Sequence, residues 1–148
     1  MCHGRWLVWN FLVCSALAPA QPVDVLTNRY NIARTGANLS EKSLRTENVS
    51  AARFGKLFDR EVDGDIYAQP LIKTGVRIPG VGVRDVVYIA TVNNSLYAFD
   101  ASDPAACAPF WHVTSAVLGQ PVPKTKVTDL PPGQPYQNFE TKIGIVST

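Results

Sequence analysis

The sequence predicts an all-β fold built on a short antiparallel meander, and three observations indicate it. The first is a continuous apolar run, Val86–Val92, which is rich in branched residues and short for a helix. The second is Asn93-Asn94, which suits a tight turn because asparagine tolerates positive φ. The third is the alternation through Ser95–Asp100, which places Tyr97 and Phe99 on one strand face. Together they predict a β-hairpin.

Two further strands are expected before this hairpin, at residues 57–62 and 66–72. Pro70 lacks a backbone N–H, so the second of these strands should be bent, bulged or at an edge. Residues 75–82, rich in glycine, predict a turn-rich connection. The four strands form a meander over residues 54–101, which is the unit of a propeller blade, although a sandwich or barrel has the same local pattern.

Length and composition restrict the class of protein. The chain has 148 residues, 46% hydrophobic and 18% charged, which allows at most one ordinary domain and argues against disorder. Its net charge of +2 is too small to predict a nucleic-acid or anionic-membrane partner. The body of the chain contains no apolar run long enough for a membrane span.

Residues 1–20 are expected to be a secretory signal peptide. Arg5 precedes an apolar stretch that ends in the small residues Ala18-Pro19-Ala20. A buried N-terminal helix or strand is the alternative. Removing twenty residues leaves 128, with 13 basic and 12 acidic side chains and Cys107 as the remaining cysteine. We therefore expect a secreted or periplasmic protein without an internal disulfide.

The flanking segments have different expected roles. Residues 21–53 are polar and predict an irregular lead-in, with a helical turn at 48–52 that Asn48 would cap. Residues 102–139 contain seven of the eleven prolines and predict a loop region, in which Phe110–Val113 is the strand candidate. Residues 140–148 are typical of the start of a second blade, so the chain is expected to be incomplete.

Val87–Thr91 and Ser95–Ala101 resemble the repeat of the quinoprotein (pyrroloquinoline-quinone-like) β-propeller family. In that family a strand ends in V-Y-x-A-T, the next contains x-L-Y-A-L-D-A, and a tryptophan follows that docks on the neighbouring blade. Phe99 replaces the usual leucine here, and Trp111 comes a few residues late. The repeat residues implied by the resemblance are Tyr88, Ala90, Thr91, Leu96, Tyr97, Ala98, Phe99, Asp100 and Trp111.

Other segments extend the resemblance to about residues 28–101. Residues 29–38 resemble the lead-in of secreted members, and residues 54–58 and 64–71 resemble the opening strands of their first blade. The resemblance implies a first blade and part of a second. A blade cannot bury its faces alone, so the expected partners are the remaining blades or another copy of the chain.

The resemblance carries no catalytic, cofactor-binding or metal-binding residue onto this chain. Quinone-dependent members use a tryptophan platform, calcium ligands and an acidic base, and no such motif surrounds Trp111. The expected function is therefore a non-catalytic fragment of an exported propeller, which in full length is a binding or scaffold protein. The alternative is the N-terminal part of a dehydrogenase for alcohols or sugars that uses pyrroloquinoline quinone and calcium.

Three other patterns have both a chemical and a structural interpretation. Alternating carboxylates at residues 59, 61, 63 and 65 would share a strand face and could bind calcium, but a solvated face is favoured. His112 could titrate as a general base, but a surface histidine is favoured. Asn38, Asn48 and Asn93 each begin an N-x-S pattern, which would accept a glycan in a eukaryotic protein.

Overall fold

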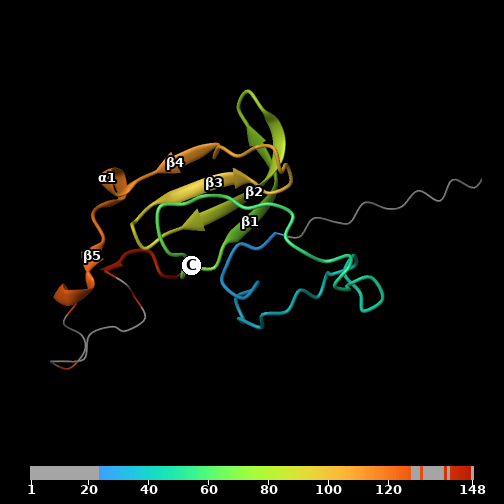
Figure 1. The fold of residues 1–148 in the computed structure, drawn as a ribbon, viewed down its shortest axis with the longest axis horizontal. Helices are drawn as coiled ribbons and strands as arrows, with labels where there is room; N and C mark the ends of the chain where they lie inside the picture. Colours follow the sequence, from blue (N-terminus) through green and yellow to red (C-terminus); the bar gives the residue numbers. More distant parts are fainter. Residues whose placement is uncertain (1–23, 128–130, 132–138, 140, 148) are drawn as a thin grey trace, which may run out of the picture.

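The computed structural model describes residues 24–127, 131, 139 and 141–147, and its centre is a four-stranded antiparallel sheet (Figure 1). The strands lie side by side in chain order, so each pairs with the next. Their bounds are β1 (Leu71–Ile78), β2 (Gly82–Ala90), β3 (Leu96–Asp100) and β4 (Trp111–Val113). The prediction of an all-β fold is confirmed for these residues, because the one α-helix they contain, α1 (Ser115–Leu118), is a single turn.

β2 and β3 form the predicted hairpin. Their register pairs Val86 with Asp100 at one end and Ala90 with Leu96 at the other. In the turn, the Asn94 N–H donates to the Thr91 carbonyl at 3.1 Å. Asn94 has a φ of 57°, the left-handed conformation that asparagine tolerates better than most residues.

The strands predicted before the hairpin are wrong in position. Residues 57–62 contain no strand, and only the last two residues of 66–72 belong to β1. β1 instead continues to Ile78, through the first half of the predicted turn-rich connection. The turn itself is short, with Val81 N–H donating to the Ile78 carbonyl at 3.1 Å.

Gly75 explains why a glycine-rich stretch is a strand. The pairing of β1 with β2 shifts register between Lys73 and Val76, which is a β-bulge. Gly75 lies in this bulge with a φ of 64°, and its N–H donates to Asp85 Oδ1 at 2.9 Å. The glycine therefore bends the strand rather than ending it.

The fourth strand comes from the proline-rich region. β4 lies within the predicted strand candidate 110–113, so the sheet extends to Val113 rather than ending at residue 101. Farther along, β5 (Val122–Pro123) pairs with β6 (Lys142–Ile143), and a short 3-10 helix, η1 (Lys124–Lys126), follows β5. β6 lies within residues 140–148, where the start of a second blade is expected. Apart from Pro131, the proline run at 130–135 lies outside the described residues.

The lead-in attaches to the sheet at its first described residues. Val25 and Ile72 exchange two backbone hydrogen bonds of 2.8 Å beside β1. Asp24 accepts hydrogen bonds from the backbone and hydroxyl of Thr74, both at 2.8 Å, and pairs with Lys73. These contacts hold the start of the lead-in at the sheet edge.

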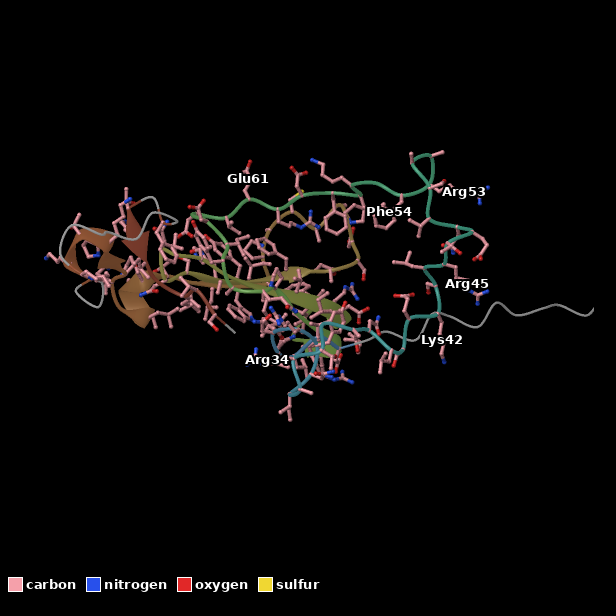
Figure 2. All side chains as sticks on the ribbon, turned by 90° about the horizontal axis from the view of Figure 1, so that it is seen from below. Arg34, Lys42, Arg45, Arg53, Phe54 and Glu61 are labelled. Carbon is pink, nitrogen blue, oxygen red and sulfur yellow. The ribbon has the colours of Figure 1, made fainter. Side chains whose placement is uncertain are left out.

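Beyond this anchor the lead-in is irregular, as predicted. Lys42, Arg45 and Arg53 lie on its outer side, away from the sheet (Figure 2). Asn48 stabilises a turn, although not the predicted one: its Oδ1 accepts from the Arg45 N–H at 2.8 Å, so it closes the turn that precedes it. The expected signal peptide, residues 1–20, lies outside the described residues. Within the described part of the chain, no helix is long and apolar enough to cross a membrane.

Residues 58–65, called the strap below, run along the sheet before β1 in both views (Figures 1 and 2). Arg60 donates to the Asp103 carbonyl at 2.6 Å, and Val92 N–H donates to the Asp65 carbonyl at 3.0 Å. The core lies mainly in the sheet. Its buried apolar residues are Val25, Ala68, Val86, Ala90, Val92, Tyr97, Ala98 and Phe99.

Candidate functional site

The repeat residues of β2, β3 and β4 are brought together in rows across the sheet. Tyr88 pairs with Ala98, and Ala98 pairs with Trp111, so all three point to the same side. The rings of Tyr88 and Trp111 lie 5.9 Å apart, centroid to centroid. Ala98 lies between them and is fully buried. Its small side chain leaves room for the two rings to contact each other.

This side of the sheet remains partly open. Trp111 is 42% exposed, and Tyr88 is half-buried. The next row along the strands, Ala90–Leu96–Val113, continues the same apolar side. We call these five residues, together with Ala98, the Trp111 face. It is an apolar surface with an aromatic pair at one edge.

The opposite side of the sheet is covered. Tyr97 stacks on Phe99, with ring centroids 5.6 Å apart, and also on His112, at 4.0 Å. Tyr97 and Phe99 are buried, and the Asp63 N–H of the strap donates to the Tyr97 hydroxyl at 3.2 Å. The stack and the strap therefore cover Tyr97 and Phe99, whereas His112 remains exposed.

Asp63 is the centre of a polar cluster where the strap passes the hairpin turn. Its carboxylate accepts from the Thr91 hydroxyl at 2.8 Å and from the Ser95 hydroxyl at 2.5 Å. Thr91 and Ser95 are almost fully buried. The Asn93 side-chain amide donates to the Asp63 carbonyl. One aspartate thus binds both ends of the turn.

The cluster shifts the pKa values of two of its side chains. Burial acts to raise the pKa of Asp63, but the hydrogen bonds from Ser95, Thr91 and Tyr97, and then the charge of His112, lower it below its ordinary value. The pKa of Tyr97 is raised, first by burial and then by the negative charge of Asp63. Asp63 is therefore held ionised and Tyr97 protonated, which suits a structural hydrogen-bond network.

Asp100, the last repeat residue of β3, has a comparable role at the other end of the strand. It is 2% exposed, and its Oδ1 accepts from the N–H groups of Ser102 and Asp103 at 2.8 and 2.9 Å. Arg84 lies 3.4 Å from Oδ2. Burial acts to raise the pKa of Asp100, but these backbone hydrogen bonds, with the charges of Arg84 and Arg60, lower it. Asp100 shapes the turn that leaves the sheet.

A small depression lies beside the Asp63 cluster. Its volume is about 150 Å³, and it is lined by Asp63, Gly64, Asp65, Tyr67, Val92, Asn93, Phe139, Thr141 and Lys142. The rings of Tyr67 and Phe139 contact each other there, with centroids 4.7 Å apart. The depression is polar and far smaller than a typical pocket for a cofactor.

The four alternating carboxylates do not act as one group. Asp63 points to the hairpin, Asp59 pairs with Lys56 at 3.4 Å, and Glu61 points away from the sheet (Figure 2). Among the described residues, no three His, Cys, Asp or Glu side chains are grouped to hold a metal ion. The four carboxylates are therefore not gathered as calcium binding by this set would require.

His112 and Cys107 are both at the surface. His112 lies in β4, stacked on Tyr97, so its contact is with an aromatic ring. Cys107 is a free, exposed thiol. The network around Asp63 was not predicted. Its members stand in two recognisable stretches, the Asp-Gly-Asp turn and the hydroxyl residues on either side of Val92–Asn94, but nothing local pairs the two.

The chain was compared with protein-family models, curated proteins and solved structures, and none of them matches it.

Proposed function

We propose that this sheet is a blade of an exported quinoprotein-like β-propeller and that the chain is a non-catalytic part of a binding or scaffold protein. The observation that carries the proposal is the difference between the two sides of the sheet. On one side the strap covers the Tyr97 and Phe99 rings, whereas the Trp111 face leaves an aromatic pair 5.9 Å apart partly in water. The meander order of the four strands is that of a propeller blade.

The Trp111 face supplies the contact that a blade requires. Blades bury their faces against neighbouring blades, because one sheet encloses too little apolar surface to be stable alone. An exposed tryptophan beside a tyrosine is well suited to such an interface, since aromatic side chains bury large areas. The proposed partners are the remaining blades of a propeller or another copy of the chain.

The contacts of the polar residues support a structural rather than a catalytic role. The Thr91 and Ser95 hydroxyls donate to the Asp63 carboxylate and are almost fully buried, so neither is accessible to a substrate. His112 lies flat against Tyr97. These groups join the strap to the hairpin. A blade that contributes to a binding surface needs only such structural contacts.

Association of the purified whole chain tests the blade proposal. Sedimentation velocity at several concentrations should show assemblies, and Trp111→Ser should shift the distribution toward monomer. The matched control is Val117→Ser, which removes a residue that is 77% exposed on α1. A wild-type chain that stays monomeric at every concentration and unfolds in one cooperative thermal transition would contradict the proposal.

A separate assay tests the enzyme alternative. The chain is mixed with calcium, pyrroloquinoline quinone, a dye acceptor and either an alcohol or a sugar. The proposal expects dye reduction at the rate of a protein-free control. Substrate-dependent reduction above that control would replace the non-catalytic proposal with the dehydrogenase.

A further inference from the structure

The asparagines of the three N-x-S patterns differ in the contacts of their side chains. An N-linked glycan is attached through the side-chain amide nitrogen of the asparagine, and the pattern includes the hydroxyl two residues later. A glycosylated asparagine is compatible with this fold only where that nitrogen faces open space. The contacts of Asn38, Asn48 and Asn93 therefore distinguish the three positions.

Asn93 has no room for a sugar. A Cβ placed on Gly64 would lie 2.7 Å from Asn93 Nδ2, so even a methyl group does not fit beside that nitrogen. The amide also donates to the Asp63 carbonyl. Ser95, the hydroxyl of the pattern, is 1% exposed. A glycan at Asn93 would separate the strap from the hairpin.

Asn48 uses both ends of its side chain within a turn. Its Nδ2 donates to the Ser43 carbonyl at 2.6 Å, and its Oδ1 accepts from the Arg45 N–H at 2.8 Å. Substitution of the amide nitrogen would disturb the first of these bonds. The turn would lose a contact that closes a loop of six residues.

Asn38 is half-buried, but its amide nitrogen makes the weakest contact of the three. Its Oδ1 accepts from the Ser40 N–H at 3.0 Å, which turns the side chain toward the hydroxyl residue of its own pattern. Its Nδ2 has one long contact, 3.4 Å, to Glu41 Oε2, whose other oxygen accepts from the Ser43 and Leu44 N–H groups at 2.7 and 2.8 Å. Leu39, between Asn38 and Ser40, is 92% exposed, so the segment lies at the surface.

We infer that Asn38 is an N-glycan acceptor when the chain passes through an export pathway that contains an oligosaccharyl transferase. This inference rests on the export included in the proposed function. In the transfer, a bond forms between Asn38 Nδ2 and C1 of the sugar. The bond from C1 to the pyrophosphate oxygen of a lipid-linked donor breaks, the lipid pyrophosphate leaves, and a base of the transferase takes the amide proton.

The test is expression of the whole chain in a eukaryotic secretory host. Protein from the medium and from the cells is treated with an amidase that removes N-glycans and leaves aspartate, and the position is mapped by mass spectrometry. We expect the mass of one glycan to be lost and the new aspartate to be at position 38. Asn38→Gln and Ser40→Ala should abolish the glycan, whereas Ser40→Thr, Asn48→Gln and Asn93→Gln should keep it.

A second version of the chain, behind an unrelated cleavable leader, separates the two proposals. If the native chain stays in the cytosol and the leader version is glycosylated at position 38, the export proposal fails and the acceptor assignment stands. A leader version that enters the pathway without a glycan at position 38 overturns the assignment. A glycan at position 93 also overturns the assignment if the secreted chain that carries it has the same sedimentation profile and thermal transition as the chain without a glycan.

Discussion

The Ser95 hydroxyl donates a hydrogen bond of 2.5 Å to the Asp63 carboxylate, across 32 positions of the chain. With the Thr91 hydroxyl on the other carboxylate oxygen, this contact joins the strap to both ends of the hairpin turn. Ser95 is buried, so its loss cannot be compensated easily by water. The stability of the hairpin and the position of the strap are therefore linked.

Ser95→Ala should destabilise the fold. Hydrogen bonds to a charged group contribute roughly 1.5–3 kcal/mol, and the partial exposure of Asp63 reduces this to about 1 kcal/mol. The measurement is the urea midpoint at fixed protein concentration. Ser40→Ala, an exposed serine in the lead-in, is the control and should leave the midpoint unchanged. Equal midpoints for both variants would mean that the Asp63 cluster does not stabilise the protein.

Acid should release the lead-in from the sheet. The pKa of Asp24 is lowered from 3.8 to about 2, mainly by the hydrogen bond from Lys73 and then by those from Thr74. Because the folded pKa is the lower one, this stabilisation is complete above pH 3.8 and is lost as the pH falls from 3.8 toward 2. Asp24→Asn should flatten the dependence of the urea midpoint on pH in that window.

Lys73→Gln provides the matched variant for this titration. Without the ammonium group, the folded pKa of Asp24 should rise toward its unfolded value, so the loss of stability on acidification should be smaller and complete at a higher pH than in the wild type. Asp63 and Asp100 also have lowered pKa values, so some acid dependence should remain in both variants. A wild-type pH profile in Asp24→Asn would show that the contacts of Asp24 do not contribute to stability.

Ala98→Leu should separate the aromatic pair. Ala98 is fully buried between Tyr88 and Trp111, and overpacking of a filled position costs roughly 1–3 kcal/mol. Denaturant unfolding measures the loss, and the tryptophan fluorescence of the native state should change with it. Ala108→Leu, at an exposed loop position, is the control. The interpretation of Ala98 as the spacer of the Trp111 face fails if both variants keep the wild-type midpoint.

Gly75→Ala should weaken the pairing of β1 with β2. The φ of 64° at Gly75 is unfavourable for a residue with a Cβ by roughly 1–2 kcal/mol. Gly55→Ala is the matched control, because Gly55 has neither a positive φ nor an atom within 4 Å of an added Cβ. Thermal unfolding of the two variants should therefore differ, with Gly75→Ala the less stable. If Gly75→Ala is as stable as Gly55→Ala, the bulge tolerates a side chain.

The local pattern of the sequence determined the hairpin. Branched residues in Val86–Val92, two asparagines and an alternating strand were enough to place β2, β3 and the turn, because these contacts are between near neighbours. The short strand near Trp111 was also recognisable. The repeat residues lie on neighbouring strands, but the sheet divides them between its two sides, and their hydrogen-bond partners were not predicted.

The first strand and the polar cluster were decided by tertiary contacts. Residues 57–62 have a pattern that suits a strand, yet they form part of a strap whose backbone bonds to side chains and turns rather than to a neighbouring strand. An extended segment becomes a strand only when the edge of another strand is available to pair with it. Residues 71–78 pair with β2, and the contact between Gly75 and Asp85 accommodates the bulge in this pairing. The partners of Asp63 lie 28 to 32 positions away, and no local pattern encodes a contact at that separation.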